Sequence, residues 1–462
     1  MENDAGFFVP PTHGYSYLPF NAATLGRLYR NDPELTNLRF RAWFEGADQI
    51  IADSKFLTSV LIDGKESSMS KNDDWCGDAC RGLVRNRSIR SFCMSIPSHR
   101  PCRGWFRALS RFFERNSKLY HIQLQGSFFG IRGPLPPNNG FDDYCIALLN
   151  TALIRNATLT RLDLFGDFNL TAKGWETFAA ALSHPDCYLE CLTLGNSGKF
   201  GDEDISCLGE ALAVNGRLIT LVFIRQRSIT SSGWRGFARC FNNPNSALVN
   251  LILFECNIDA DGATEIVSAL SENARLEELS MTNNNHLREK DWSDLSRVLC
   301  DTTSIERTFS SNHTLRKLHA KRWLNEGVES DEDEENWSEE DYDSLIVDGR
   351  IKDDIERSFW MNYNANKAEV ARFKILKHHF PRGDIVGDVF ASMAESTLPF
   401  AIEWIGRRSS GSKYQIIKNL EETVMFNFVR NHPELFDIRN KSAVVTNRKA
   451  AAKKRKRQPL HG

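Results

Sequence analysis

The sequence contains none of the short motifs that commonly mark an enzyme or a membrane protein. Its 462 residues hold no apolar run near the ~20 residues that a membrane-spanning helix needs. A P-loop, a Gly-x-Ser-x-Gly and a His-Glu-x-x-His are all missing. The first eleven residues contain two acids and no base, so no secretory signal is expected. We therefore predict a non-enzymatic intracellular protein with no cofactor and no membrane contact.

Cysteine is present, but not in a pattern typical of disulfides or zinc. The eleven cysteines are an odd number and are scattered from Cys76 to Cys300. Two close pairs, 76–80 and 187–191, each lack a second pair at the spacing that a zinc site requires. We predict buried free thiols in a reducing compartment and no metal site.

A repeated phrase dominates what the sequence does contain. Asn-x-x-Leu, or once Asn-x-x-Ile, recurs before stretches of the form Leu-x-x-Leu-x-Leu. Its asparagines are Asn86, Asn116, Asn156, Asn215, Asn245, Asn273 and Asn312. The apolar residues that open the stretches are Ile89, Leu119, Leu159, Leu189, Leu218, Leu248, Leu276 and Leu315. Their spacing is 28–30 residues, with two intervals of 39–40. Such a period predicts a solenoid, in which each unit buries its apolar side against its neighbours.

Each unit has a strand half and a helix half, so the predicted fold class is α/β. Residues 170–182 and 229–241 share the pattern of a glycine and a tryptophan followed by apolar residues at helical spacing. The strand half alternates apolar and other residues, with the leucines directed to the interior. The tryptophans are predicted to belong to the core.

This pattern resembles the ribonuclease-inhibitor-like leucine-rich repeat family. Leu251-x-Leu253-x-x-Cys256-x-Ile258, with Gly262 and a helix ending at Leu270, carries the resemblance best. The phrase at 311–315 and the region after it also resemble uncharacterised leucine-rich repeat proteins predicted in diatoms. The family resemblance implies a horseshoe with parallel strands inside, helices outside, and ligand recognition on the concave strand face.

Residues between the leucines should point outward on that concave face, because side chains alternate along a strand. We predict a partner-binding surface there, in which apolar residues on neighbouring strands form the centre. Its residues are Arg161, Asp163, Phe165, Val222, Ile224, Asn250, Ile252, Phe254 and Glu278. His121 and His319 are expected to be ordinary polar surface residues. The alternative is that the insertion at 126–140 folds over the face and covers it.

The composition divides the chain into five regions. Residues 1–85 are expected to form an N-terminal cap or degenerate repeats, with weak strand openings at Leu35 and Leu57. The repeats follow at 86–324, then an acidic disordered linker at 325–344. A small all-α region is expected at 345–437 and a disordered basic tail at 438–462.

The two tails carry most of the charge. Residues 326–343 contain eleven acids and no base, while seven of the ten residues at 448–457 are basic. Ser330 and Ser338 precede acidic residues, as in acid-directed phosphorylation sites. The cluster of Lys453, Lys454, Arg455, Lys456 and Arg457 is typical of a nuclear localisation signal. Nucleic-acid contact through it would be non-specific and driven by phosphate charge.

The leading hypothesis is a protein-interaction scaffold of unknown partner, nuclear or nucleocytoplasmic. One alternative is a small-GTPase regulator, because Ran GTPase-activating proteins resemble this chain in combining such repeats with an acidic stretch. No functional residue of theirs is carried over to this sequence. The second alternative is a substrate receptor of a ubiquitin-ligase complex.

Overall fold

The computed structural model describes most of the repeats and part of the C-terminal region. The described residues are 18–19, 22–40, 47–63, 81–96, 103–126, 141–166, 168, 170–197, 199–271, 273–284, 289–319, 349–363 and 367–379. They fall into two compact units. The first contains the described residues up to 299 and those between 314 and 359, and the second those of 300–313 and those from 360 onward.

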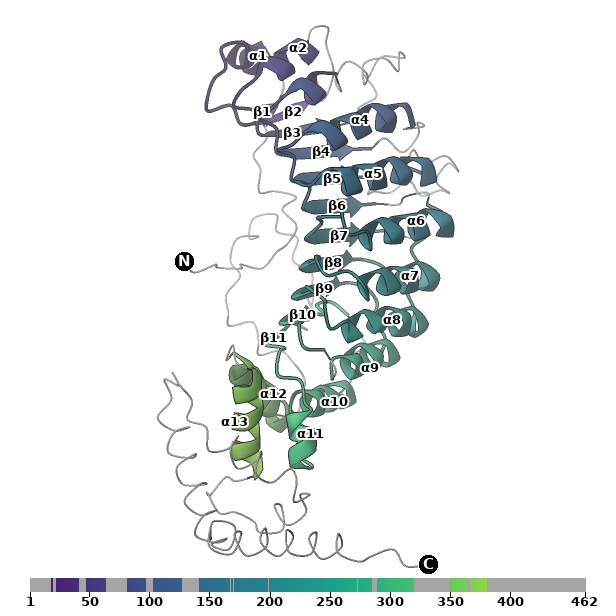
Figure 1. The fold of residues 1–462 in the computed structure, drawn as a ribbon, viewed down its shortest axis with the longest axis vertical. Helices are drawn as coiled ribbons and strands as arrows, with labels where there is room; N and C mark the ends of the chain where they lie inside the picture. Colours follow the sequence, from purple (N-terminus) through teal and green to yellow (C-terminus); the bar gives the residue numbers. More distant parts are fainter. Residues whose placement is uncertain are drawn as a thin grey trace, which may run out of the picture. The chain divides into compact units, whose positions relative to one another are not determined.

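The first unit is built on one parallel sheet of eleven strands, which pair in chain order from β1 to β11 (Figure 1). The strands are β1 (Leu18–Pro19), β2 (Asn37–Phe40), β3 (Ser59–Asp63), β4 (Ser91–Ser95), β5 (His121–Gln125), β6 (Arg161–Phe165), β7 (Cys191–Gly195), β8 (Thr220–Ile224), β9 (Asn250–Phe254), β10 (Glu278–Ser280) and β11 (Lys317–His319). Three of them precede residue 86, so the sheet extends into the region where a cap or degenerate repeats were expected.

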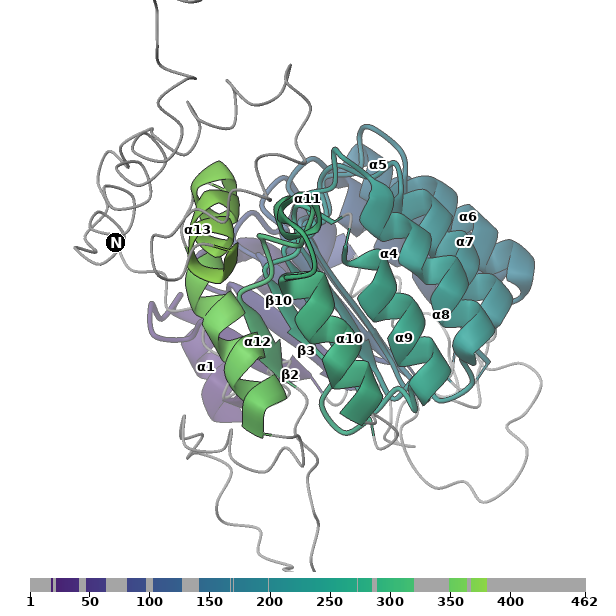
Figure 2. The same cartoon turned by 90° about the horizontal axis from the view of Figure 1, so that it is seen from below.

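Helices connect the strands and cover one face of the sheet, as Figure 2 shows for α4 to α10. The helices are α1 (Ala22–Tyr29), α2 (Ala47–Asp53), α4 (Arg103–Arg115), α5 (Asp143–Arg155), α6 (Ala172–Leu182), α7 (Asp202–Leu212), α8 (Ser231–Ala238), α9 (Ala260–Ala269) and α10 (Glu289–Leu299), with a 3₁₀ turn η1 (Arg239–Asn242) after α8. Residues 81–85 are also helical. Helix α12 (Gly349–Asn362) begins in the first unit and ends in the second.

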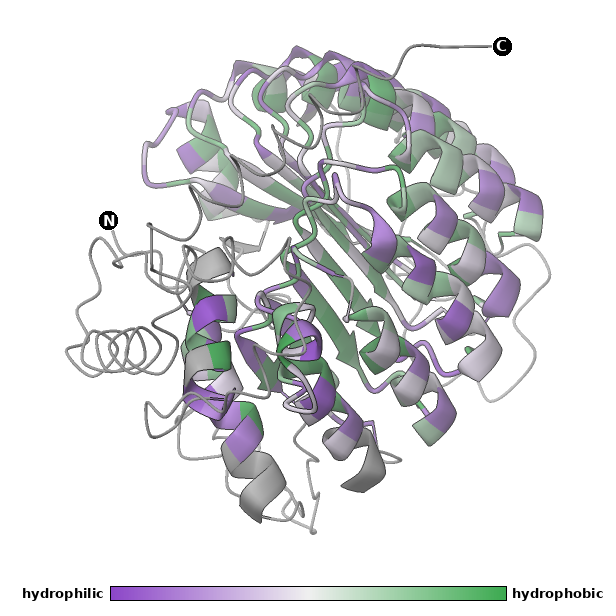
Figure 3. Cartoon of the chain, turned by 60° about the horizontal axis from the view of Figure 1, so that its bottom comes forward, coloured by the Kyte–Doolittle hydropathy of each residue, from purple (hydrophilic) through white to green (hydrophobic). Residues whose placement is uncertain are grey.

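The leucines of the repeat form the core between sheet and helices. Leu162 and Leu164 of β6 pair in register with Leu192 and Leu194 of β7, and all four are at most 2% exposed. Trp234 on α8 packs edge-on against a neighbouring phenylalanine and is fully buried. The strands are accordingly the greenest part of Figure 3, and the helices alternate in hydropathy as amphipathic helices do. The predicted α/β solenoid is confirmed.

In most repeats the repeated asparagine ties the end of its helix to the preceding repeat. The Asn156 side-chain amide donates to the carbonyl of Asn116, and the amide of Asn86 donates to the carbonyls of Ile51 and Ser54. Helix-end carbonyls have no partner within their own helix, so these amides satisfy groups that would otherwise be buried without a hydrogen bond. In the β9 repeat the side chain of Asn243, and not that of Asn245 in the repeated phrase, donates to the carbonyl of Asn215. A longer turn before Leu248 moves the position by two residues.

The glycine before the tryptophan in the phrases at 170–182 and 229–241 also has a packing reason. The Asp143 carboxylate accepts a hydrogen bond from the backbone N–H of Thr171 at 2.9 Å, and a Cβ on Gly174 would collide with that carboxylate. The same contact recurs two repeats further along the chain, where the Asp202 carboxylate accepts a hydrogen bond from the backbone N–H of Thr230. The shared phrase at 170–182 and 229–241 therefore reflects helix-to-helix packing and not a ligand site.

The second unit contains α11 (Ile305–Phe309) and α13 (Lys367–His379), which contact each other. Thr308 of α11 lies 2.8 Å from the Nε2 atom of His379. The Lys374 ammonium is buried and donates to the carbonyl of Asn312, which also accepts from the side chain of Asn362. Burial is the main reason that the pKa of Lys374 falls to about 7.

Candidate functional site

The sheet face turned away from the helices, here called the concave face, is formed by three rows of side chains. They follow from the strand register, because residues paired across parallel strands lie side by side. The first row is Ser91, His121, Arg161, Cys191, Thr220, Asn250, Glu278 and Lys317. The second is Cys93, Gln123, Asp163, Thr193, Val222, Ile252, Ser280 and His319. The third is Ser95, Gln125, Phe165, Gly195, Ile224 and Phe254.

A buried polar network fills the concave face between β4 and β7. His121 Nε2 lies 2.9 Å from Asp163 Oδ2, and the Arg161 guanidinium donates to the same oxygen at 3.1 Å. Ser91 Oγ lies 3.0 Å from the other ring nitrogen of His121. His121 is 4% and Asp163 1% exposed, so the prediction that His121 is an ordinary surface residue was wrong. Its hydrogen-bond partner Asp163 lies 42 residues further along the chain.

The network holds Asp163 as a carboxylate. Burial raises the pKa of this carboxyl, but the hydrogen bond from His121 and the charges of His121 and Arg161 outweigh it, so that the pKa lies below its usual range. A buried carboxylate is stable only when such partners are present. The oxygen Oδ1 of Asp163 is itself buried and forms no hydrogen bond.

Ser91, His121 and Asp163 are joined in the order of a hydrolase triad, but their geometry does not support catalysis. In that mechanism the nucleophile must be reached by a substrate, with hydrogen-bond donors beside it for the oxyanion. Ser91 is 3% exposed, and its strand β4 is paired along both edges, by β3 and β5. The network therefore stabilises the sheet.

On β8 and β9, the central residues of the concave face are apolar and no longer polar. Val222 is buried, whereas Ile224, Ile252 and Phe254 are half-buried. Phe165 leans over Gly195 on the neighbouring strand, since a Cβ there would lie 2.5 Å from the Phe165 ring. The phenyl ring thus fills the space of the missing side chain, and its exposure drops to 4%.

Polar groups border the apolar residues. On the N-terminal side of the strands, Asn250 donates to the hydroxyl of Thr220, and Lys317 pairs with Glu278 at 2.9 Å. Asn250, Thr220 and Glu278 are half-buried. An apolar centre with a polar, accessible border is the usual composition of a protein-binding surface.

At the other end of these strands, Arg225 and Glu255 follow β8 and β9 directly and form an ion pair of 2.7 Å. Arg227 also reaches Glu255, at 3.0 Å. Arg225 has φ 54° and Glu255 φ 52°, in the left-handed region where the two preceding repeats place Gly166 and Asn196. Arginine and glutamate gain nothing from that backbone conformation, and such strained residues cluster at functional sites. Sequence reasoning missed this pair, although its place in the repeat could have suggested it.

The nine predicted binding residues all lie on the concave face, but not all of them point into solvent. Asp163, Phe165 and Val222 are buried, which contradicts their predicted outward exposure. The remaining six are half-buried: Arg161, Ile224, Asn250, Ile252, Phe254 and Glu278. Arg161 belongs to the network of Asp163, so the accessible part of the surface lies on β8 to β10.

Several other predictions fall on parts of the chain that the structure does not describe. Ser330, Ser338, the acidic run and the basic cluster at 453–457 lie outside the described residues, as do residues 127–140 of the insertion at 126–140. Within the described ranges there is no group of three or more His, Cys, Asp or Glu residues that could hold a metal. Among the same residues, no helix is long and apolar enough to cross a membrane.

Comparison with known proteins agrees with the repeat pattern. No family model matches the chain. It is 32% identical over 149 residues to the bovine NACHT, LRR and PYD domains-containing protein 5, and 26% identical over 193 residues to the human protein 14 of that name. The matches cover 32% and 37% of this chain but only 13% and 17% of those proteins. The chain is a leucine-rich repeat protein.

Solved structures with a similar arrangement of helices and strands match more weakly. The leucine-rich repeat-containing protein LegL7 of Legionella pneumophila has 13% identity and a TM-score of 0.38, covering 62% of this chain and 89% of LegL7. A structure of the yeast Rad7 and Elc1 complex has 14% identity and a TM-score of 0.33, covering 65% and 72%. At these scores neither neighbour adds to what the strand order of this leucine-rich repeat protein establishes.

Proposed function

We propose that this leucine-rich repeat protein is a non-enzymatic scaffold that binds a protein partner on the concave face of β8 to β10. The observation that supports it most is the half-buried apolar group of Ile224, Ile252 and Phe254 between two polar borders. When a partner covers accessible apolar side chains, the free energy of the complex falls by about 25 cal/mol per Å² of apolar surface removed from water. The strained Arg225–Glu255 pair adds charged groups at the edge of the same surface.

A double substitution tests this surface. Ile224→Asp with Phe254→Asp should remove captured partners from the full-length protein, because two carboxylates cannot be desolvated against an apolar partner. The matched control is Val214→Asp with Ile219→Asp, two aliphatic residues that are 68% and 39% exposed outside the concave face. Both variants are first compared with the wild type by circular dichroism and thermal unfolding.

The readout is quantitative mass spectrometry of co-purified proteins, followed by binding of the purified partner. A partner kept by the control and lost by the concave-face variant supports the proposal. Equal partner lists for both variants contradict it.

The finer predictions about location and pathway rest on sequence alone. A nuclear or nucleocytoplasmic location follows from the basic cluster at 453–457, and regulation from Ser330 and Ser338. The likeness to diatom proteins also stays a prediction. Of the two alternatives, the GTPase regulator is tested by hydrolysis assays with candidate small GTPases, and the ubiquitin-ligase receptor by co-purified ligase subunits.

A further inference from the structure

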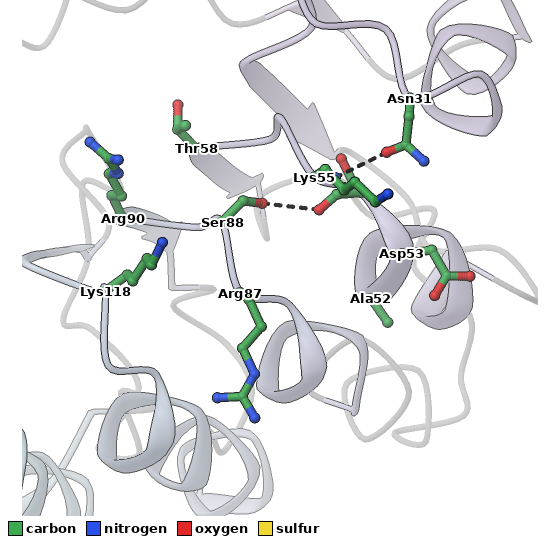
Figure 4. A pocket seen from close by; sticks show the side chains of 10 residues that line it. Asn31, Ala52, Asp53, Lys55, Thr58, Arg87, Ser88, Arg90 and Lys118 are labelled. Atoms are coloured by element: carbon green, nitrogen blue, oxygen red, sulfur yellow. Dashed lines mark hydrogen bonds between the residues drawn. The ribbon is translucent and has the colours of Figure 1, made fainter.

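A second, chemically different site lies near the N-terminal end of the first unit. It is a cleft of about 640 Å³ whose wall carries four cationic side chains: Lys55, Arg87, Arg90 and Lys118. Figure 4 shows Lys55 on one side, Arg90 and Lys118 on the other, and Arg87 between them. We propose that this cleft binds a ligand with two or three linked phosphate groups.

Among the residues that the structure describes, the four cations have no acidic partner of their own. None forms a salt bridge with a described residue, and the lining contains one acid, Asp53. The Asp53 carboxylate accepts a hydrogen bond from the amide of Gln49. Four like charges around one opening repel one another, so an anion that enters lowers the free energy of the cleft.

Capping of helix ends does not account for these charges. Cations often stand at helix C-termini, where they interact with free carbonyls. Here the carbonyl of Ser54 already accepts from the side chains of Asn86 and Ser88, and the carbonyl of Leu57 also accepts from Ser88. The amide and hydroxyl donors are therefore used within the fold, whereas the cationic groups are exposed.

In later repeats, charged residues also occur at the edge of the sheet where the strands begin, and there some of them form ion pairs. Arg316 stands at the repeat position of Arg90, directly after the leucine that opens the strand, and it pairs with Glu277 at 3.1 Å. Glu190 occupies that position in the β7 repeat. At the repeats of β3 to β5, four cations without an ion pair to a described residue thus surround one opening. The later repeats carry single arginines, Arg217 and Arg275, and the acids Glu190 and Glu277 before their strands.

This limited extent favours a small ligand over a nucleic acid. Pockets for small molecules commonly measure roughly 300–1,000 Å³, a range that includes this cleft. A nucleic-acid track would need a continuous run of cations over a longer distance, but Glu190 and Glu277 interrupt such a run in the later repeats. Guanidinium and ammonium groups together suit phosphate oxygens, which accept several charge-assisted hydrogen bonds at once.

The test is isothermal titration of the full-length chain with sodium tripolyphosphate. The double variant Arg90→Gln, Lys118→Gln should bind at least about tenfold more weakly, since it removes two cations that would donate charge-assisted hydrogen bonds to the phosphate oxygens. Lys118→Gln has a matched control in Arg275→Gln. Both residues are exposed, both directly precede a strand-opening leucine, and both changes remove one positive charge. The basic run at 448–457 is the same in every variant.

Binding that weakens in the cleft variants and not in Arg275→Gln supports the proposal. Binding to vesicles that contain a phosphoinositide then distinguishes a lipid headgroup from a free oligophosphate as the ligand. Loss of binding to either one in the cleft variants supports the site. Three results would overturn it: no binding by the wild type, sulfate binding as tightly as tripolyphosphate, or unchanged affinity in the double variant. Tight binding of single-stranded RNA under conditions where tripolyphosphate does not bind would also overturn it.

Discussion

Strands β4 to β7 and strands β8 to β10 carry the same repeat but fill the concave face with opposite chemistry. The first group buries His121, Asp163 and Arg161 in one hydrogen-bonded network. The second presents Ile224, Ile252 and Phe254, all half-buried: Ile252 lies in the row of Asp163, and Ile224 and Phe254 lie in the row of Phe165. A solenoid can therefore use one stretch of its inner face for internal stability and leave the next for contact with other molecules.

We expect the largest loss of stability when a buried carboxyl, such as that of Asp163 in the first group of strands, is introduced into the second group. Val222 occupies the row of Asp163 and is 1% exposed, but it has no cation beside it in the strand register. In Val222→Asp the carboxyl would have to be held protonated, which costs about 4 kcal/mol at pH 7. Urea unfolding measures this loss, with Val222→Asn as the uncharged control. Equal losses in the two variants would contradict the comparison.

A smaller loss is expected from removing the carboxylate that is already present. Asp163→Ala leaves Arg161 and His121 without their shared acceptor and should lower the free energy of unfolding by about 3 kcal/mol. Gln123→Ala, in the same row on β5, serves as the control and should have little effect, since Gln123 is half-buried. A loss below about 1 kcal/mol for Asp163→Ala would show that the network adds little stability.

The smallest effect is a pH dependence of opposite sign for the two carboxyls. The pKa of Asp163 is lowered in the folded protein, so its stabilising effect is present above pH ~4 and is lost as the pH falls through the folded value. The stability difference between wild type and Asp163→Asn should shrink as the pH falls below about 4. In Val222→Asp, acid should instead relieve the destabilisation. Urea unfolding at each pH measures both, and parallel profiles would contradict the assignment.

Much of this fold could be predicted, because the pattern that forms it is local. The openings at Leu159, Leu189 and Leu218 each stand two residues before an observed strand. The alternation of side chains along each strand also placed the nine predicted residues on the concave face correctly. Exposure could not be predicted, because it depends on neighbours in other repeats: Phe165 is buried since Gly195 lies beside it. The partner of His121 likewise depends on a strand register that no local pattern reveals.

The asparagine amides that tie successive repeats together are interrupted at two places among the described residues. The amide nitrogen of Asn116, before β5, is buried and donates no hydrogen bond. In the β7 repeat the corresponding position is Asp186, which is exposed and donates no such hydrogen bond, whereas Asn156 before it and Asn215 after it both do. Repeats in a solenoid are stabilised mainly by their nearest neighbours. If the two ends of the sheet were pulled apart, the interface between the β4 and β5 repeats and the one between the β6 and β7 repeats would therefore resist with fewer hydrogen bonds. These two interfaces are where we expect a stretched chain to separate first.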